Sequence, residues 1–101
     1  MSESGARDDP QRLMVRVPAH VVYRDFADQT VALNLQTGRY HGLNETSRQM
    51  LDVLREAPTV ADAAQRLAPR WEVDFDVLLA DLVNLCDGLA RRGLIETVVV
   101  E

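Results

Sequence analysis

Very few residues in this sequence have side chains suited to nucleophilic or metal chemistry. There is one cysteine, Cys86, and there are two histidines, His20 and His41. A cysteine beside a histidine can act as a nucleophile with its base. However, Cys86 lies near Leu82 and Leu89 at helical spacing, which predicts a small buried apolar side chain. The histidines fall on separate predicted strands and lack the spacing of metal ligands. We therefore expect no catalytic residue, no metal and no cofactor.

The charged residues argue against several further classes of protein. Sixteen acidic residues stand against eleven basic ones, which gives a formal net charge of -5. The acidic residues are spread over predicted polar faces, and this favours a solvated surface over an acid and base pair. Gly38 and Gly42 do not form a phosphate-binding loop. Because nucleic acids and anionic membranes attract basic faces, we expect neither as a partner, and we expect no enzyme.

The length of 101 residues fits one small domain. Residues 1–17 are rich in polar and charged types and predict a flexible N-terminal tail, with the folded domain at 18–101. A lone cysteine cannot form an internal disulfide. The N-terminus shows no apolar signal segment, and no apolar run approaches the roughly 20 residues of a membrane span. We expect a cytoplasmic protein.

Three short strands are predicted in the first half of the folded region. Residues 20–26 are rich in β-branched and aromatic types. Residues 30–35 alternate, with Val31 and Leu33 on one face and Ala32 on the other, as in a half-buried strand. A turn containing Gly38 leads into the third strand at residues 39–43.

Three helices are predicted next. The first follows the N-cap Asn44 and ends near Glu56, and Thr59 caps the second. Residues 69–73 are expected to link to a third helix, which runs from the N-cap Asp74 to a stop at Gly93. Residues 94–100 fit a terminal strand or an extension after the helix. Strands followed by helices predict an α+β fold that resembles a winged helix-turn-helix.

The third predicted helix has an unusually wide apolar face. At about 100° per residue, its apolar side chains span an arc of roughly 160°, whereas a surface helix needs about 100°. Either the helix is packed between two layers, or one edge of the arc lines an open groove. The opposite face carries four aspartates, so the helix is poorly suited to the acceptor-rich DNA major groove. The apolar residues are Phe75, Leu78, Leu79, Leu82, Val83, Leu85, Cys86, Leu89 and Ala90.

The third predicted strand, residues 39–43, has no obvious strand after it to pair with. An unpaired edge strand can accept an extended peptide from another molecule. Three of its residues each allow two interpretations. Arg39 is either a solvated hairpin residue or a partner for an acidic ligand side chain. Tyr40 and His41 are either ordinary sheet residues or part of a peptide groove.

Three segments together resemble the PqqD-like family of small peptide-binding domains, also called RiPP recognition elements. They are LNLQTGRYHGLNETSRQMLDVL, PTVADAAQRL and VDFDVLLADLVNLCDGLARRGLI. The resemblance covers roughly residues 21–95, and its most specific part is LNETS after the glycine-containing hairpin. The family often has glycine where this chain has Ser47, so close packing there is expected to differ.

The resemblance implies three antiparallel strands packed against three helices. It also implies a function, which is to capture the leader segment of a ribosomally made precursor peptide and present it to modifying enzymes. The leader adds as a strand to the third strand, and its side chains enter a groove beside the third helix. The implied peptide-binding residues are Arg39, Tyr40, His41, Gly42, Leu43, Phe75, Leu78, Leu79 and Leu82.

Within the family, a free-standing domain fits lasso-peptide biosynthesis best. Its implied partners there are a separate leader peptidase and a macrolactam cyclase. The nearest rival is a peptide chaperone in pyrroloquinoline quinone biosynthesis, with a radical enzyme as partner. A winged-helix DNA regulator and a dimerisation domain that pairs through the free edge are the remaining alternatives.

Overall fold

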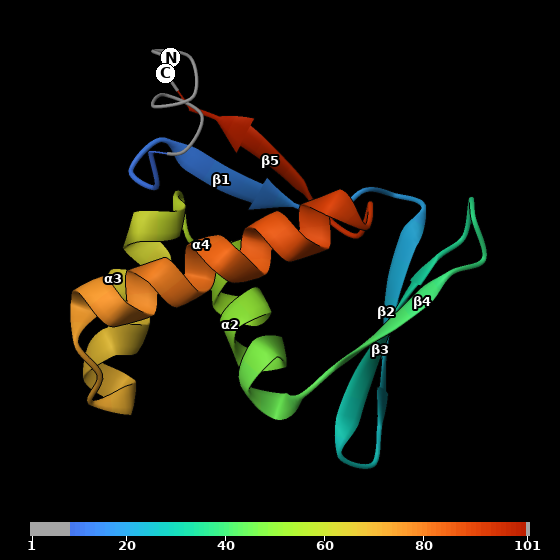
Figure 1. Ribbon diagram of the computed structural model, residues 1–101, viewed down its shortest axis with the longest axis horizontal. Helices are drawn as coiled ribbons and strands as arrows, with labels where there is room; N and C mark the ends of the chain where they lie inside the picture. The colour runs from blue at the N-terminus through green and yellow to red at the C-terminus, as the bar shows by residue number, and fades with distance from the viewer. Residues whose placement is uncertain (1–8, 101) are drawn as a thin grey trace.

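A computed structural model describes residues 9–100 of the chain. Two small antiparallel sheets flank a group of three helices (Figure 1). This arrangement confirms the predicted α+β class. In chain order the elements are β1 (Leu13–Arg16), β2 (Val21–Phe26), β3 (Gln29–Asn34), β4 (Tyr40–Leu43), α2 (Glu45–Glu56), α3 (Val60–Trp71), α4 (Phe75–Arg91) and β5 (Glu96–Val99).

The three predicted strands form one antiparallel sheet in the order β2-β3-β4. In the β3–β4 hairpin, Leu33 lies opposite Tyr40 and Ala32 lies opposite His41. Gly38 has φ 76°, a conformation that side-chain-bearing residues rarely adopt, and this explains glycine in the turn. The predicted strand boundaries are confirmed to within a residue or two.

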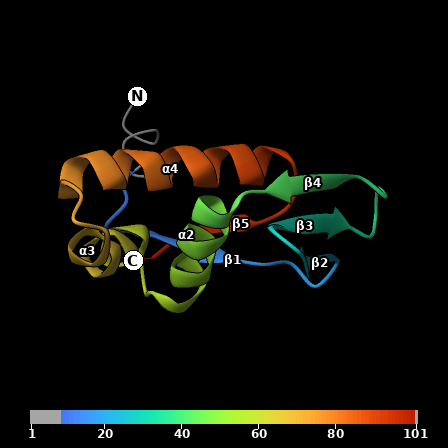
Figure 2. The same ribbon diagram turned by 90° about the horizontal axis from the view of Figure 1, so that it is seen from below.

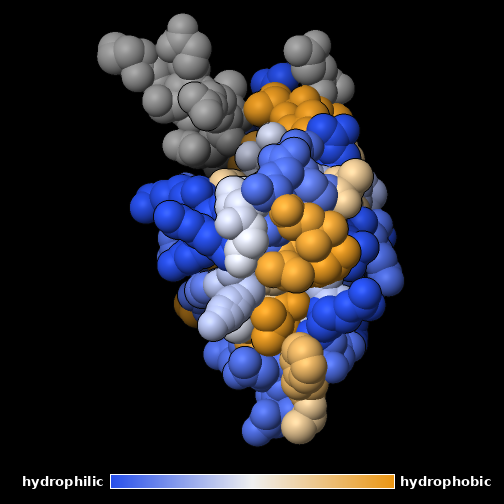
Figure 3. All heavy atoms as spheres, turned by 90° about the vertical axis from the view of Figure 1, so that its right-hand side faces the viewer, coloured by the Kyte–Doolittle hydropathy of each residue, from blue (hydrophilic) through white to orange (hydrophobic). Residues whose placement is uncertain are grey.

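The alternation in β3 is confirmed, but the buried face is the less apolar one. Thr30, Ala32 and Asn34 are buried, while Val31 and Leu33 on the other face are partly exposed. Asn34 is accommodated because its Oδ1 accepts hydrogen bonds from the backbone N–H groups of residues 36 and 37. On the face of the molecule where β2, β3 and β4 lie, apolar residues gather near the middle of the surface (Figure 3).

The second sheet pairs the two ends of the described chain. β1 and β5 are antiparallel, with Leu13 opposite Val99 and Arg16 opposite Glu96. The terminal segment is therefore a strand, one of its two predicted alternatives. The sequence predicts a flexible tail through residue 17, but residues 13–16 form β1, and Leu13 and Val15 are buried in the core. The expected tail at residues 1–8 lies outside the described residues.

The predicted helix starts are confirmed by their caps. The side chains of Asn44, Thr59 and Asp74 each accept a hydrogen bond from the backbone N–H three residues later. The predicted end of the second helix is wrong, because Pro69 lies inside α3, which continues to Trp71. Pro69 is exposed. Packing of Trp71 against the core keeps the last turn helical despite the missing proline N–H.

Helix α4 lies across α3, and its buried face is the centre of the core (Figure 2). Leu78, Leu82, Cys86 and Leu89 are buried along it. The predicted burial of Cys86 is thus confirmed, and burial raises the pKa of its thiol to about 12. A buried neutral thiol is a packing group rather than a nucleophile.

The β2–β4 sheet is fastened to the end of α4 by two side chains. The Tyr23 hydroxyl donates to the Leu94 carbonyl oxygen at 2.9 Å, and Asn34 Nδ2 donates to the Gly93 carbonyl oxygen at 3.4 Å. Gly93 has φ 72°, and a Cβ there would lie 3.2 Å from Asn34 Nδ2. Only glycine therefore provides both the turn after α4 and the space for Asn34.

Replacing Tyr23 with Phe should weaken this attachment. We expect the free energy of unfolding to fall by about 1 kcal/mol, the usual net contribution of one hydrogen bond. Burial raises the pKa of Tyr23 from 10.0 to about 12, against an opposing effect of Arg55. The folded state therefore keeps the phenol proton in a pH range where the unfolded chain releases it. The contribution of the Tyr23 hydroxyl to the free energy of unfolding is complete below pH 10 and is lost as the pH rises towards 12.

Urea unfolding at neutral pH and at increasing alkaline pH measures both effects. Tyr23→Phe should be less stable at neutral pH and should lose stability less steeply with rising pH than the wild type. A variant with unchanged stability and an unchanged alkaline slope would contradict the role of this hydroxyl.

The Cys86 thiol should resist modification while the protein is folded. Because the thiolate is the reactive form, and burial opposes its formation, Ellman's reagent should react slowly in native buffer and rapidly in urea. Cys86→Ala provides the blank. Rapid stoichiometric labelling of the folded protein would show that the thiol is accessible.

Candidate peptide-binding site

Strand β4 is the edge of its sheet. Among residues 9–100, no strand pairs with its outer side. The Asn34 N–H donates to the Arg39 carbonyl oxygen at 2.9 Å. Bonded and non-bonded residue pairs alternate along an antiparallel ladder. By that alternation His41 is bonded to β3, and the N–H and C=O groups of Tyr40 and Gly42 point outwards. The outer edge thus offers two main-chain donors and two acceptors.

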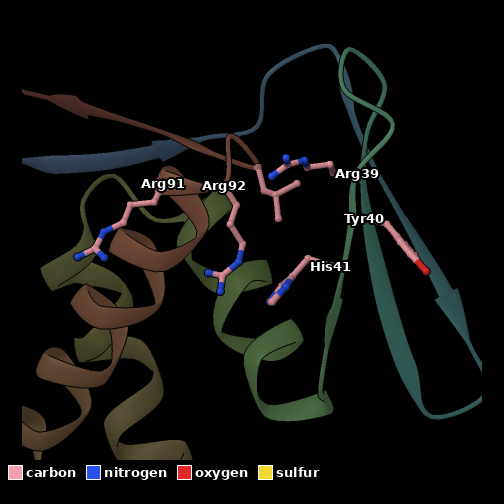
Figure 4. A pocket seen from close by; sticks show the side chains of 6 residues that line it. Arg39, Tyr40, His41, Arg91 and Arg92 are labelled. Atoms are coloured by element: carbon pink, nitrogen blue, oxygen red, sulfur yellow. The ribbon is translucent and has the colours of Figure 1, made fainter.

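A hollow of about 250 Å³ lies beside this edge, between β4 and the C-terminal end of α4 (Figure 4). Arg39 and His41 extend into it from the strand, and Arg92 extends towards it from the end of α4. Leu94, which is buried, also lines it. The fastening of the sheet to Gly93 and Leu94 holds the two sides of the hollow together.

Half of the residues that line the hollow are arginines. Arg91 forms an ion pair with Asp87 one turn earlier in α4. The Arg92 Nη1 donates to the Gly88 carbonyl oxygen at 3.0 Å. Gly88 leaves room for this, because a Cβ there would lie 3.3 Å from the same nitrogen. The lining residues are Arg39, Tyr40, His41, Arg91, Arg92 and Leu94.

The predicted site residues of the strand divide between different environments. Tyr40 turns its side chain away from the hollow and is 68% exposed, so only its backbone borders the hollow (Figure 4). Gly42 is exposed at the edge, and Leu43 is buried in the core. Of the predicted strand residues, Arg39 and His41 are the two whose side chains enter the hollow.

The predicted site residues of the helix do not lie beside this edge. Leu78 and Leu82 are 1% and 0% exposed and belong to the core. Phe75 and Leu79 are partly buried against it. All four come from the half of α4 that is remote from β4, as Figures 1 and 2 both show. The wide apolar arc is thus explained by packing on both flanks of the buried face.

Three lining residues, Arg91, Arg92 and Leu94, are absent from the predicted site. The available signal is the sequence RRGL, in which two arginines directly precede the helix-ending glycine. Its position next to the hairpin depends on tertiary contacts, which the local pattern does not contain.

The described residues contain no group of three or more His, Cys, Asp or Glu side chains placed to hold a metal ion. None of the helices in residues 9–100 combines the length and apolarity needed to cross a bilayer. The chemistry available at the β4 edge is hydrogen bonding by the main chain, supplemented by charge and apolar contact.

Solved structures similar to this chain include two peptide complexes. TbiB1 in complex with the TbiA(beta) leader peptide has a TM-score of 0.72 and 27% identity, and the match covers 80% of this chain and 94% of that one. Lasso peptide synthetase B1 complexed with the leader peptide has a TM-score of 0.74 and 24% identity, over 81% and 96% of the two chains. The latter likeness supports the fold alone.

A third similar structure is the PqqD truncation of Methylobacterium extorquens PqqCD. It is described as a functional and stand-alone RiPP recognition element, with a TM-score of 0.65 and 25% identity over 81% of this chain and 87% of that one. No curated protein sequence matches the chain significantly.

The sequence profile of coenzyme PQQ synthesis protein D (PqqD) matches residues 29–95, which is well over half of the chain. The matched region begins at β3 and ends just after the turn that follows α4, so it includes both sides of the hollow. The expected family resemblance is confirmed, and the chain belongs to the PqqD family.

Proposed function

We propose that this protein binds the leader segment of a ribosomally synthesised precursor peptide by strand addition to β4. It then presents the bound precursor to a separate leader peptidase and a macrolactam cyclase, as in lasso-peptide biosynthesis. The observation that carries the proposal is the free edge of β4, with the main-chain groups of Tyr40 and Gly42 directed outwards beside a lined hollow.

Similarity to proteins with known ligands supports this proposal. TbiB1, which is similar in both sequence and fold, was solved with a leader peptide bound. The Methylobacterium extorquens PqqD domain is described as a recognition element for ribosomally made, modified peptides. The two matches cover 80% and 81% of this chain.

Binding by strand addition requires no catalytic group on the binding protein. Main-chain hydrogen bonds provide affinity with little dependence on ligand sequence, and pockets for alternate side chains provide selectivity. The buried, neutral Cys86 lies in the core rather than at the β4 edge. We therefore assign the protein a binding role, with the chemistry performed by its partner enzymes.

A peptide chaperone in pyrroloquinoline quinone biosynthesis is the second candidate, because the matching family profile carries that description. The same edge would serve there, and the identity of the precursor distinguishes the two pathways. The acidic surface of α4 disfavours a DNA-binding role, because DNA phosphates would repel it. The exposed carboxylates are Asp74 just before the helix and Asp76, Asp81 and Asp87 along it.

Proline at position 42 should block strand addition without disturbing the hairpin. It removes an N–H that points outwards, whereas the hydrogen bonds between β3 and β4 remain. We expect Gly42→Pro to weaken the binding of an extended peptide at least about tenfold, equivalent to about 1.4 kcal/mol. The probe is a fluorescein-labelled peptide selected on the wild-type protein from a random display library, and fluorescence anisotropy measures its affinity.

Gly42→Ala is the matched control, because it adds a Cβ at 3.2 Å from Gln29 Nε2 but keeps the N–H. Its affinity should stay within about twofold of the wild type, as is usual for a surface substitution. Circular dichroism verifies that both variants fold. If folded Gly42→Pro binds as well as Gly42→Ala, strand addition at β4 is wrong. If no extended peptide is enriched on the wild type, the proposed function is wrong.

A further inference from the structure

We propose that the hollow beside β4 binds an acidic side chain, Asp or Glu, of the captured peptide, held by Arg39 and Arg92. This inference rests on the proposed function, since it concerns the peptide that would add to β4. It goes further by assigning one chemical requirement to the ligand and by naming the residues that would impose it.

The charge of the hollow is opposite to that of the chain as a whole. The protein has a formal net charge of -5. Nevertheless, three of the six residues that line the hollow are arginines, a fourth is His41, and none is acidic. A local concentration of guanidinium groups in an acidic protein indicates an anionic partner.

Arg39 and Arg92 have hydrogen-bonding capacity to spare. Among the described residues, the side chain of Arg39 has no hydrogen-bond or ion-pair partner. Arg92 uses Nη1 for the Gly88 carbonyl oxygen, which leaves most of its five N–H donors free. Arg91, by contrast, is paired with Asp87. Two available guanidinium groups can hold one carboxylate through charge-assisted hydrogen bonds.

The ordinary role of arginine at a helix end does not account for the whole group. Arg91 and Arg92 lie at the C-terminal end of α4, where cations offset the negative end of the helix dipole. Arg39 belongs to the hairpin instead, and it extends into the same hollow from the opposite side (Figure 4). The convergence of separate elements on one space distinguishes this cluster from a simple cap.

Strand geometry determines which ligand residue enters the hollow. Side chains on a strand alternate between faces, and Arg39 and His41 point into the hollow while Tyr40 points away. A peptide paired with β4 places every second side chain on that same face. Main-chain pairing alone permits slippage by two residues, so one acidic side chain held here would fix the register of the bound leader.

A display selection tests this inference. Random 12-residue peptides are selected in parallel on the wild type, on Arg39→Glu/Arg92→Glu and on Arg66→Glu/Arg70→Glu. The last pair makes the same change in net charge at exposed positions of α3. We expect the wild type and the α3 variant to enrich peptides that carry Asp or Glu at one fixed position relative to their apolar residues. The hollow variant should enrich Lys or Arg at that position.

The best wild-type peptide and its version with Gln in place of the acidic residue are then compared by fluorescence anisotropy. The acidic form should bind the wild type about tenfold more tightly, as one charge-assisted hydrogen bond would give. The difference should shrink at high salt because the hollow is open to solvent. Arg39→Gln removes one positive charge at an exposed site. It should reduce the preference for the acidic peptide without affecting thermal stability.

The outcomes separate this inference from the proposed function. If all three proteins enrich extended peptides with no acidic preference, or with the same one, the acidic subsite is wrong and strand addition stands. If the enriched peptides bind Gly42→Pro and Gly42→Ala equally well, strand addition fails, and the subsite fails with it.

Discussion

The arrangement of this domain depends on how its sheet is fastened to the end of α4. Tyr23 and Asn34 donate to consecutive carbonyl oxygens, those of Leu94 and Gly93. The left-handed conformation of Gly93 ends the helix and turns these carbonyls towards the sheet. Burial of Leu94 and Ile95 stabilises the same junction. If this junction moved, β4 and the arginines of α4 would no longer border one hollow.

The junction also explains how this domain forms a defined site beside a free strand edge. Strand β4 provides directional main-chain donors and acceptors along its free edge. The end of α4 provides side chains that a bound peptide would meet on one face of the added strand. Affinity and selectivity would thus come from different parts of the molecule, which suits a protein that recognises one segment of a longer chain.

Local features of the sequence predict the elements well because each has a local cause. Asn44, Thr59 and Asp74 identify the helix starts, since capping involves residues only three positions apart. Alternation in residues 30–35 identifies β3, although it does not reveal which face is buried. The sequence predicts that the second helix ends before Pro69, whereas α3 continues to Trp71, because the packing of Trp71 against the core is a tertiary effect.

The parts that the sequence does not predict all depend on contacts between distant residues. Strand β1 forms by pairing with β5, which lies eighty or more residues later in the chain. The apolar arc of α4 does not reveal which residues approach β4, and Leu78 and Leu82, which are predicted to contact a peptide, are buried in the core. Arg92 reaches the hollow only because the sheet is docked at Leu94.

Amide hydrogen exchange followed by NMR tests directly whether a peptide adds as a strand to β4. Exchange is measured residue by residue for the free protein and for its complex with a display-selected peptide. The amides of Tyr40 and Gly42 should exchange rapidly in the free protein and become protected in the complex. The amide of His41, already bonded to β3, should change little. A bound peptide that leaves the Tyr40 and Gly42 amides unprotected would contradict strand addition at this edge.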